Sequence, residues 1–410
     1  IVGLAQDFVG SNNLNLLLPN GQFGTRIQGG HDCASARYIH TELNPIVAHL
    51  FPKADLPLLT YNDDDGQLVE PTHYLPIIPM VLVNGMNGIG TGFSTSIPKY
   101  SVKDVAENIL KRLRGNVYGE LTPSYQGFKG TIHKVDDKSF MSKGCYMIVN
   151  PTTLRITELP IGTWTENYKK FLDGLLADEA PKKKSNEKVK KEPKYTIVDY
   201  VNNSSDTRVD FTITLPLGML HSLQWSEDPN IDGIEKYFKL TTTKGLSLSN
   251  IHLYNDKQQI GRYETINEIF DEFYERRHEL YVKRKNYQLK LYENVIAILG
   301  SKIRFIKEVI DESIVIYRQK RATIVKSLRS RDYPQVADKV VLDGKDCDKS
   351  DETSNYDYLV KMSLYSFTEE EIAKLQAEHD KNVQQYNDLQ ARSVEDIWIE
   401  ECENLLKNLK

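Results

Sequence analysis

Cysteine is scarce in this sequence, and the few cysteines lie far apart. The 410 residues contain only Cys33, Cys145, Cys347 and Cys402, and none of them forms a CxxC pair. Zinc sites and disulfide frameworks need cysteines at closer, regular spacings. The pattern therefore argues against both and favours a reducing compartment.

Long apolar runs and the marks of a signal peptide are also absent. No run approaches the roughly 20 apolar residues that a membrane-spanning helix needs, so we expect no membrane partner. Residues 1–6 include neither a starting Met nor the charged and apolar regions of a signal peptide. We therefore expect an intracellular piece of a longer protein.

The sequence shows no excess of positive charge, because its formal net charge is -5. A basic patch on a long acidic protein can still bind nucleic acid, so this balance excludes little. A chain of this length is too long for one hydrophobic core, and two to four domains are expected.

The first 262 residues predict short elements separated by turns. Residues 1–76 are rich in Gly, Asn and Pro, and residues 77–262 alternate β-rich runs with turn signals. We predict strands at 79–83 and at 209–215, the second from its alternation of apolar and polar residues. A helix is expected to open at Ser101. This part of the chain is predicted to be mixed α and β.

A lysine-rich stretch interrupts this region at residues 181–194. It holds seven lysines and two glutamates. Val189 and two prolines are its only apolar residues. Such a composition is typical of a solvated loop. A nuclear-localisation or DNA-contacting role is the alternative.

The C-terminal third predicts long helices. Thr265 to Glu268 reads as a capping box, and from there to residue 328 there is no proline and only one glycine, Gly300. Apolar residues recur three and four apart, so we predict a helix over 265–328 that is about 95 Å long. A helix of that length needs a partner helix.

Two further cap sequences supply that partner. Thr368 and Ser393 each precede a helical apolar pattern, and the polar residues 333–354 between the helices read as a loop. We predict an antiparallel helical hairpin with an apolar cluster at its far end. Because an isolated tip should not expose so much apolar surface, we expect dimerisation there. The cluster comprises Tyr358, Leu359, Met362, Leu364, Tyr365 and Phe367.

The residues best suited to chemistry lie at 21–39. Glycines and small side chains would let backbone amides approach an anion, and Arg26 and Arg37 carry charge suited to phosphate. Tyr38 follows Arg37 directly. An Arg-Tyr pair by itself is usually structural.

This stretch resembles the active-site region of type IIA DNA topoisomerases. Residues 21–26 read GQFGTR, as in the family, and residues 29–39 read GGHDCASARYI, where the family pattern is GGKDAASxRYI. The similarity continues in order and spacing through 8–17, 70–80 and 84–92, and more loosely through the helical region. Nearly the whole chain is covered.

The resemblance implies that Tyr38 is a nucleophile that forms a phosphotyrosyl link to a DNA 5′ end. A phenol ionises only near pH 10, roughly, so it needs a base or a positive field. Arg37 would hold the scissile phosphate and stabilise the transition state. The family's assisting histidine and its metal-binding Toprim carboxylates would lie outside this chain. The resemblance therefore implies Mg²⁺ and ATP for the full-length enzyme and no metal ligand here.

The resemblance also assigns DNA contacts. Ile89 matches an isoleucine that wedges between base pairs and bends the duplex, although a core isoleucine is the structural alternative. Arg26 and His31 are further candidate DNA-binding residues. His31 stands where the family has Lys, and His40 where Phe or Tyr is usual; a mostly neutral histidine would weaken a DNA contact.

The family then implies a multidomain α+β fold. We expect the C-terminal part of a winged-helix domain with Tyr38 at 1–76 and a mixed α/β tower domain at 77–262. A long antiparallel coiled coil with a helical dimerisation gate is expected at 263–410. The implied function is ATP-dependent double-strand passage by a nuclear homodimer that binds double-stranded DNA, cuts it transiently, and so relaxes and decatenates it.

Other readings are weaker. Residues 88–92 do not have the G-x-G-x-x-G spacing of a dinucleotide site, and 93–98 does not open a helix. Residues 63–66 lack the downstream ligands of a calcium loop, so a hairpin turn is expected. A non-catalytic, DNA-clamping coiled-coil protein remains the alternative function, and only the Tyr38 region argues against it.

Overall fold

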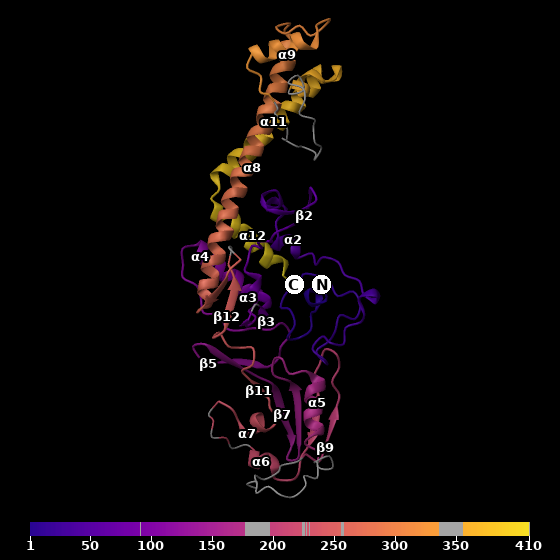
Figure 1. The fold of residues 1–410 in the computed structure, drawn as a ribbon, viewed down its shortest axis with the longest axis vertical. Helices are drawn as coiled ribbons and strands as arrows, with labels where there is room; N and C mark the ends of the chain where they lie inside the picture. Colours follow the sequence, from indigo (N-terminus) through magenta and orange to yellow (C-terminus); the bar gives the residue numbers. More distant parts are fainter. Residues whose placement is uncertain are drawn as a thin grey trace. The chain divides into compact units, whose positions relative to one another are not determined.

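The computed structural model describes residues 1–90, 92–176, 197–223, 226, 228, 230–255, 258–335 and 356–409. These residues form two compact units. Unit 1 comprises Ile1–Lys53, Tyr61–Arg277 and Ile399–Lys410, and unit 2 comprises Ala54–Thr60 and His278–Trp398. The elements of each unit can be followed in Figure 1. The lysine-rich segment 181–194 and most of the predicted loop 333–354 lie outside the described residues.

The largest sheet of unit 1 has four antiparallel strands in the order β7-β8-β10-β9. Their bounds are Cys145–Asn150 (β7), Thr153–Glu158 (β8), Phe211–Thr214 (β10) and Asp199–Asn202 (β9). Strand β10 confirms the strand predicted over 209–215. Alternate residues of β8 and β10 point into one core, which includes Leu154, Ile156 and Phe211.

Short helices cover the apolar face of this sheet. They are α5 (Thr165–Asp173), α6 (Met219–Leu223) and α7 (Gly233–Tyr237). Tyr168 and Leu172 of α5 are buried in the same core as the strands. Figure 1 shows α5 beside the strands of this sheet. Because the two faces differ so clearly, the register of the sheet is fixed by burial.

Smaller sheets complete unit 1. A three-stranded sheet has the order β11-β6-β5, and three hairpins are formed by β1 and β2, β3 and β4, and β12 and β13. The bounds are Tyr61–Asp64 (β1), Gln67–Pro71 (β2), Met86–Gly90 (β3), Phe93–Ile97 (β4), Thr131–Asp136 (β5), Ser139–Lys143 (β6), Thr241–Thr242 (β11), Ile251–Tyr254 (β12) and Ile260–Tyr263 (β13). The predicted turn at 63–66 is confirmed, with Asp65 and Gly66 at φ of 50° and 87°.

The prediction of a strand at 79–83 was wrong. These residues enter helix α3 (Met80–Asn84), in which Leu82 and Val83 are fully buried. A short apolar run cannot be assigned by periodicity alone, and here tertiary burial selects the helix. Gly85 ends it at φ 64°, where an added Cβ would lie 2.6 Å from the Ile97 carbonyl oxygen.

The remaining short helices of the N-terminal region include the one predicted at Ser101. They are α1 (Val2–Ala5), η1 (Ala36–Tyr38), α2 (Val47–Leu50), η2 (Lys53–Leu58) and α4 (Val102–Leu113). Ser101 is the N-cap of α4, as predicted, although its side chain makes no capping hydrogen bond.

Helix α8 (Ile266–Ile310) begins where the sequence predicts. The Thr265 hydroxyl accepts a hydrogen bond from the Glu268 amide at 3.4 Å, and the Glu268 carboxylate accepts one from the Glu264 amide at 2.9 Å. With 45 residues the helix is about 68 Å long.

The prediction that this helix continues to residue 328 was wrong. Glu312 and Arg318 adopt left-handed conformations, at φ of 55° and 61°, and a separate helix α9 follows (Arg321–Ser330). Asp and Ser at 311–313 favour turns over helix. The break also lets Ile314 become buried beside Phe305.

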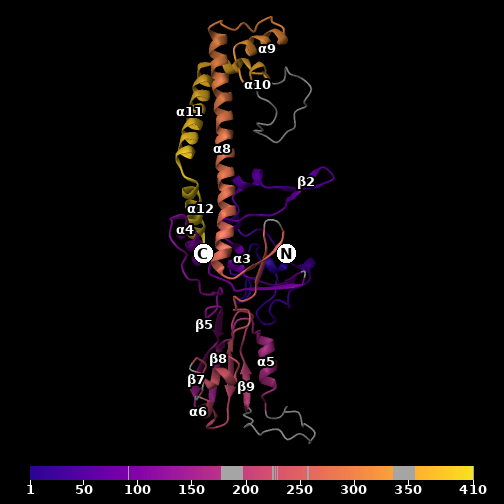
Figure 2. The same cartoon turned by 60° about the vertical axis from the view of Figure 1, so that its left-hand side comes forward.

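Unit 2 confirms the antiparallel helical hairpin. Helix α11 (Glu369–Ala391) is capped by Thr368, and α12 (Val394–Asn408) by Ser393, as predicted. Helices α8 and α11 lie side by side in Figure 1 and in Figure 2. Their contacts run in opposite directions: Lys285 Nζ donates to the Gln390 carbonyl at 3.1 Å, Tyr386 donates to Glu293 at 2.9 Å, and Gly300 lies against His379.

The predicted apolar cluster at the end of the hairpin is largely covered within the unit. Leu359 of α10 (Asp357–Val360) is 1% exposed, and Tyr358, Met362 and Phe367 are partly buried in the same cluster. The expectation that this cluster is exposed was therefore wrong, because it packs on residues of α8 and α9. Tyr365 of η5 (Leu364–Phe367) differs from them, because its side chain is 71% exposed.

We predict that Ile156→Ala destabilises unit 1 by about 2–5 kcal/mol, since it removes fully buried methyl groups from the sheet core. Ile148→Ala is the matched control, because Ile148 on the neighbouring strand is 43% exposed. The control should change stability by less than about 0.5 kcal/mol. Urea denaturation of the two variants measures the difference, and equal losses would contradict the assignment of the two faces.

Candidate active-site loop and DNA-contacting hairpin

Residues 20–40 form a tightly folded loop, here called the tyrosine loop. Its two halves run past each other: the Ala34 amide donates to the Gln22 carbonyl at 2.9 Å, and the His40 amide donates to the Asn20 carbonyl at 3.0 Å. Asp32 accepts hydrogen bonds from the Thr25 amide at 2.9 Å and the Thr25 hydroxyl at 2.5 Å. The loop is therefore held by its own backbone on both sides of Tyr38.

The loop presents Tyr38 to solvent. Tyr38 ends the short 3₁₀ helix η1 and is 70% exposed. The Arg37 guanidinium lies over the Tyr38 ring, 5.4 Å from its centroid, which places a permanent positive charge beside the phenol. An exposed phenol with a neighbouring cation is accessible to a large anionic partner.

The loop's glycines serve internal packing. An added Cβ at Gly24 would lie 2.6 Å from the Gly30 Cα, one at Gly30 would lie 2.4 Å from Gln6 Nε2, and one at Gly29 would lie 2.2 Å from the Trp164 ring. The prediction that these glycines let backbone amides approach an anion does not account for their close contacts within the protein. In this structure they let the loop close on itself and on Trp164.

Asp32 is a charged part of this fold. Burial raises the pKa of its carboxyl, but the hydrogen bonds from Thr25 and the nearby His31 outweigh burial, so the pKa lies below its usual value. Asp32 therefore stays ionised as an acceptor for Thr25. The neighbouring His31 is exposed, so it is accessible to a ligand.

Arg26 is buried, in contrast to Arg37. Its guanidinium binds the Glu158 carboxylate at 2.5 Å, and the two side chains are only 7% and 1% exposed. A DNA contact by Arg26 stays a prediction, but here its charge is already matched by a carboxylate.

Ile89 lies near the end of the hairpin formed by β3 and β4, where it pairs with Ser94. Its side chain is 86% exposed, so it is not the core isoleucine of the structural alternative. An apolar side chain held in solvent on a hairpin has the form of a wedge for a base step.

The β3–β4 hairpin is supported from one side by β12. The His252 amide donates to Thr95 Oγ1 at 3.1 Å, the His252 ring lies 2.9 Å from the Ser94 carbonyl oxygen, and Asn250 bonds Ser94 Oγ at 2.8 Å. The Phe93 ring packs against the His252 ring in a tilted arrangement, with a centroid distance of 5.4 Å. These contacts hold the strand opposite Ile89.

Lys99 anchors the base of the same hairpin. Its ammonium donates to the carbonyl oxygens of Gly10, at 3.1 Å, and Ser11. Burial lowers the pKa of Lys99 to about 8, because its charged form is partly removed from water.

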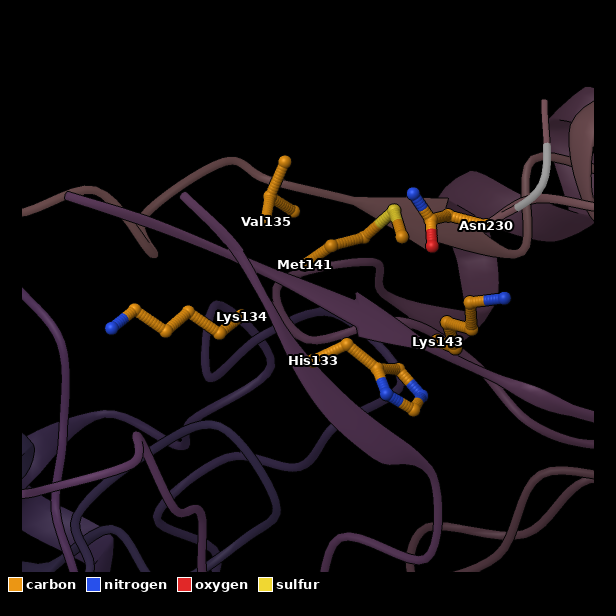
Figure 3. Close-up of a pocket in the computed structure, with 6 residues that line it drawn as sticks. All are labelled: His133, Lys134, Val135, Met141, Lys143 and Asn230. Atoms are coloured by element: carbon orange, nitrogen blue, oxygen red, sulfur yellow. The ribbon is translucent and has the colours of Figure 1, made fainter. Parts of the chain in front are cut away.

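A surface cavity of about 360 Å³ lies on the sheet that contains β5 and β6 (Figure 3). It is lined by His133, Lys134, Val135, Met141, Lys143 and Asn230, and Lys134 extends away from the other side chains. Both lysines already have acidic partners, Lys143 with Glu235 at 2.7 Å and Lys134 with Glu120 at 2.9 Å. The cavity therefore offers no unmatched charge for a phosphate.

Among the described residues, no group of three His, Cys, Asp or Glu side chains could hold a metal ion. The same part of the chain contains no helix long and apolar enough to cross a membrane.

Sequence reasoning missed Glu158 and Trp164, which position the tyrosine loop. Glu158 ends a strand 132 residues after Arg26, and nothing in either local sequence indicates the pairing. Nothing in the sequence around Trp164 indicates that its side chain packs against the tyrosine loop. Only the folded chain brings these residues to the loop.

The known proteins that this chain is similar to in sequence and in fold are type II DNA topoisomerases. The family model for the A-type subunits of DNA gyrase and topoisomerase IV matches residues 1–403, and the chain belongs to this family. It is 40% identical over 437 residues to DNA topoisomerase 2 of Arabidopsis thaliana, covering 100% of this chain and 28% of that protein. It is 36% identical over 420 residues to DNA topoisomerase 2 of Penicillium chrysogenum, covering 99% and 25%.

A solved structure has the same fold. The chain matches the crystal structure of the Plasmodium falciparum topoisomerase II DNA-binding, cleavage and re-ligation domain with a TM-score of 0.81 and 33% identity. The match covers 99% of this chain and 54% of that one. The chain thus spans only about a quarter of the length of the Arabidopsis and Penicillium relatives.

We predict that Gly29→Ala destabilises the chain more than Gly66→Ala. Both glycines have positive φ, 65° and 87°, so either alanine loses about 1–2 kcal/mol of backbone energy. Gly66 faces open space, whereas the new methyl at Gly29 would clash with Trp164 and add about 1–3 kcal/mol. Chemical denaturation compares the two, and equal losses would show that Trp164 does not pack on the loop.

Proposed function

We propose that this chain is the DNA-breakage portion of an ATP-dependent type II DNA topoisomerase. The observation that carries this proposal is Tyr38 itself, exposed beside Arg37 on an anchored loop. The family membership and the likeness to a cleavage and re-ligation domain support it. The transient double-strand break would allow a second duplex to pass, so that the enzyme relaxes and decatenates DNA.

In the proposed reaction the Tyr38 oxygen attacks a DNA phosphorus. A bond forms between that phosphorus and the phenolic oxygen while the bond to the 3′ oxygen breaks, which leaves a 5′-phosphotyrosyl link and a 3′ hydroxyl. The phenolic proton leaves to a base outside this chain, and the 3′ oxygen gains a proton. Arg37 would hold the phosphate and stabilise the charge of the transition state. Reversal of the same step rejoins the strand.

Further parts of the enzyme must complete this reaction. We propose that Mg²⁺ and ATP are bound by other domains of the full-length enzyme, as the likeness to DNA topoisomerase 2 implies. The magnesium ion would supply charge stabilisation at the phosphate. We also propose a nuclear location.

We propose that DNA lies against both exposed features of unit 1. Ile89 would insert between base pairs and bend the duplex, and His31 would contact DNA where the family has Lys. Residues 1–76 would belong to a winged-helix domain, 77–262 to a tower domain, and 263–410 to a coiled coil and gate.

We propose a homodimer through the C-terminal helices. The burial of Leu359 removes it from the predicted contact surface. Among the described residues, exposed apolar side chains near the end of the hairpin include Ile310, Val315, Tyr317 and Tyr365. A two-fold contact between such surfaces would cover them, and it could open for a passing duplex.

We predict that Tyr38→Phe lowers DNA cleavage by the full-length enzyme about 10³-fold or more, because only the attacking oxygen is lost. DNA affinity should stay close to that of the wild type. Tyr74→Phe is the matched control, since Tyr74 is also well exposed, and it should cleave normally. The measurement is the covalent enzyme–DNA complex trapped by denaturant. Wild-type levels in Tyr38→Phe would show that another residue is the nucleophile, whereas a wild type that forms no covalent complex would favour a non-catalytic DNA clamp.

We predict that Ile89→Ala reduces DNA bending and cleavage without loss of stability. Its side chain is 86% exposed, so unfolding should change by less than about 0.5 kcal/mol, far from the roughly 2–5 kcal/mol of a core isoleucine. Leu217→Ala is the control, because Leu217 is 85% exposed. Fluorescence transfer across a labelled duplex reports the bend. Unchanged bending in Ile89→Ala would contradict the wedge.

A further inference from the structure

The tyrosine loop is attached to the sheet side of unit 1 by its backbone. The carbonyl oxygens of Arg26 and Ile27 accept hydrogen bonds from the amides of Thr165, at 3.4 Å, and Glu166, at 3.0 Å. Helix α5 has no side-chain cap at Trp164, so the loop satisfies amides at its first turn. The same Trp164 ring lies against Gly29.

A buried ion pair fixes the attachment. Besides Arg26, Glu158 accepts hydrogen bonds from the Leu159 amide at 2.9 Å and the Lys129 amide at 3.3 Å. Both oxygens of Glu158 face Arg26, whose two terminal nitrogens lie at 2.5 and 3.4 Å. An arginine–carboxylate pair with two contacts constrains orientation as well as distance. Glu158 therefore acts as a fixed point at the end of β8.

The fixed point is connected to Tyr38 through short links. Arg26 adjoins Thr25, which bonds Asp32 twice. On the other side of that contact, Gln22 bonds Ala34, and the Tyr38 amide donates to the Ser35 carbonyl at 2.9 Å. A displacement of Arg26 would thus be carried to the backbone that bears Tyr38.

A second ion pair on the same strand makes no such connection. Arg155 of β8 binds Asp210 at 2.7 and 2.8 Å, and the Asp210 side chain is 5% exposed. This pair belongs to the sheet alone. It provides a natural comparison for the pair at Arg26.

We propose that Glu158 and Arg26 are positioning residues for the cleavage reaction, and that they set where Tyr38 stands relative to the DNA phosphate. The proposal rests on the proposed role of Tyr38. Neither residue touches the reacting atoms, so their removal should slow the chemical step while DNA still binds. An ångström of misplacement at a reacting group can cost roughly 100-fold in rate.

The test measures the rate of DNA cleavage at saturating DNA and, separately, the DNA affinity of the full-length enzyme. Glu158→Gln keeps the side-chain shape but removes the charge that holds Arg26. We expect cleavage to slow by about tenfold or more, with the dissociation constant for DNA changed by less than about threefold. Arg26→Met should behave alike, and Arg26→Lys, which keeps the charge, should recover part of the rate.

Asp210→Asn is the control, because it breaks the ion pair between Arg155 and Asp210 and should lower thermal stability without slowing cleavage.

If cleavage by Glu158→Gln is as fast as by the wild type while Tyr38→Phe is inactive, the positioning proposal fails and the proposed function stands. If Tyr38→Phe still cleaves, both fail. Weaker DNA binding with an unchanged rate at saturation would instead make Arg26 a binding residue and overturn the proposal. Should Glu158→Gln not fold, the comparison of Arg26→Lys with Arg26→Met decides by the same rates.

Discussion

The buried ion pair between Arg26 and Glu158 is the interaction on which the geometry of the tyrosine loop depends. Removing two charges from water is costly, and a buried pair is tolerated only when its remaining hydrogen bonds are also made. Glu158 meets that condition through the amides of Lys129 and Leu159. Loss of one partner would leave a buried charge at a cost of about 3–5 kcal/mol. The loop therefore has one strongly favoured position on the sheet.

The sheet can hold that position because its own core is well buried. Leu154, Ile156 and Glu158 lie at every second position of β8, on the same face. Leu154 and Ile156 are fully excluded from solvent, so the strand cannot slip without exposing them. Burial of the apolar side chains thus fixes the register of β8, and the register fixes the position of the Glu158 carboxylate that binds Arg26. The position of Arg26 in turn constrains the loop that carries Tyr38.

The features predicted correctly from sequence are those with a local cause. The caps at Thr265, Thr368 and Ser393 are hydrogen bonds within one helical turn. The strand β10 follows from the alternation of apolar and polar residues over a few positions. The strand predicted at 79–83 failed because burial of Leu82 and Val83 decides that segment. The end of α8 was missed because the burial of Ile314 depends on partners from another helix.

The site divides in the same way. Tyr38, Arg37 and Ile89 are predicted from short motifs that resemble a family, whereas the partners that hold the loop come from a distant strand and helix. The glycines of the loop were assigned to anion binding because a sequence does not show Trp164 on the other side. Such contacts join residues more than a hundred positions apart, and no local pattern encodes them.

The two arginines of the tyrosine loop show how solvent exposure distinguishes a side chain that stabilises the fold from one that is available to a partner. Arg26 and Arg37 carry the same group, yet Arg26 is matched by a carboxylate in the interior and Arg37 lies in solvent over the Tyr38 ring. Neither the exposed charge nor the exposed Ile89 contributes much to folding, since each would be as well solvated in the unfolded chain. The fixed positions of Arg37 and Ile89 therefore matter for binding a partner and not for folding. An exposed phenol, a neighbouring cation and an exposed apolar side chain would suit the proposed partner, because duplex DNA is anionic and its base pairs can be unstacked.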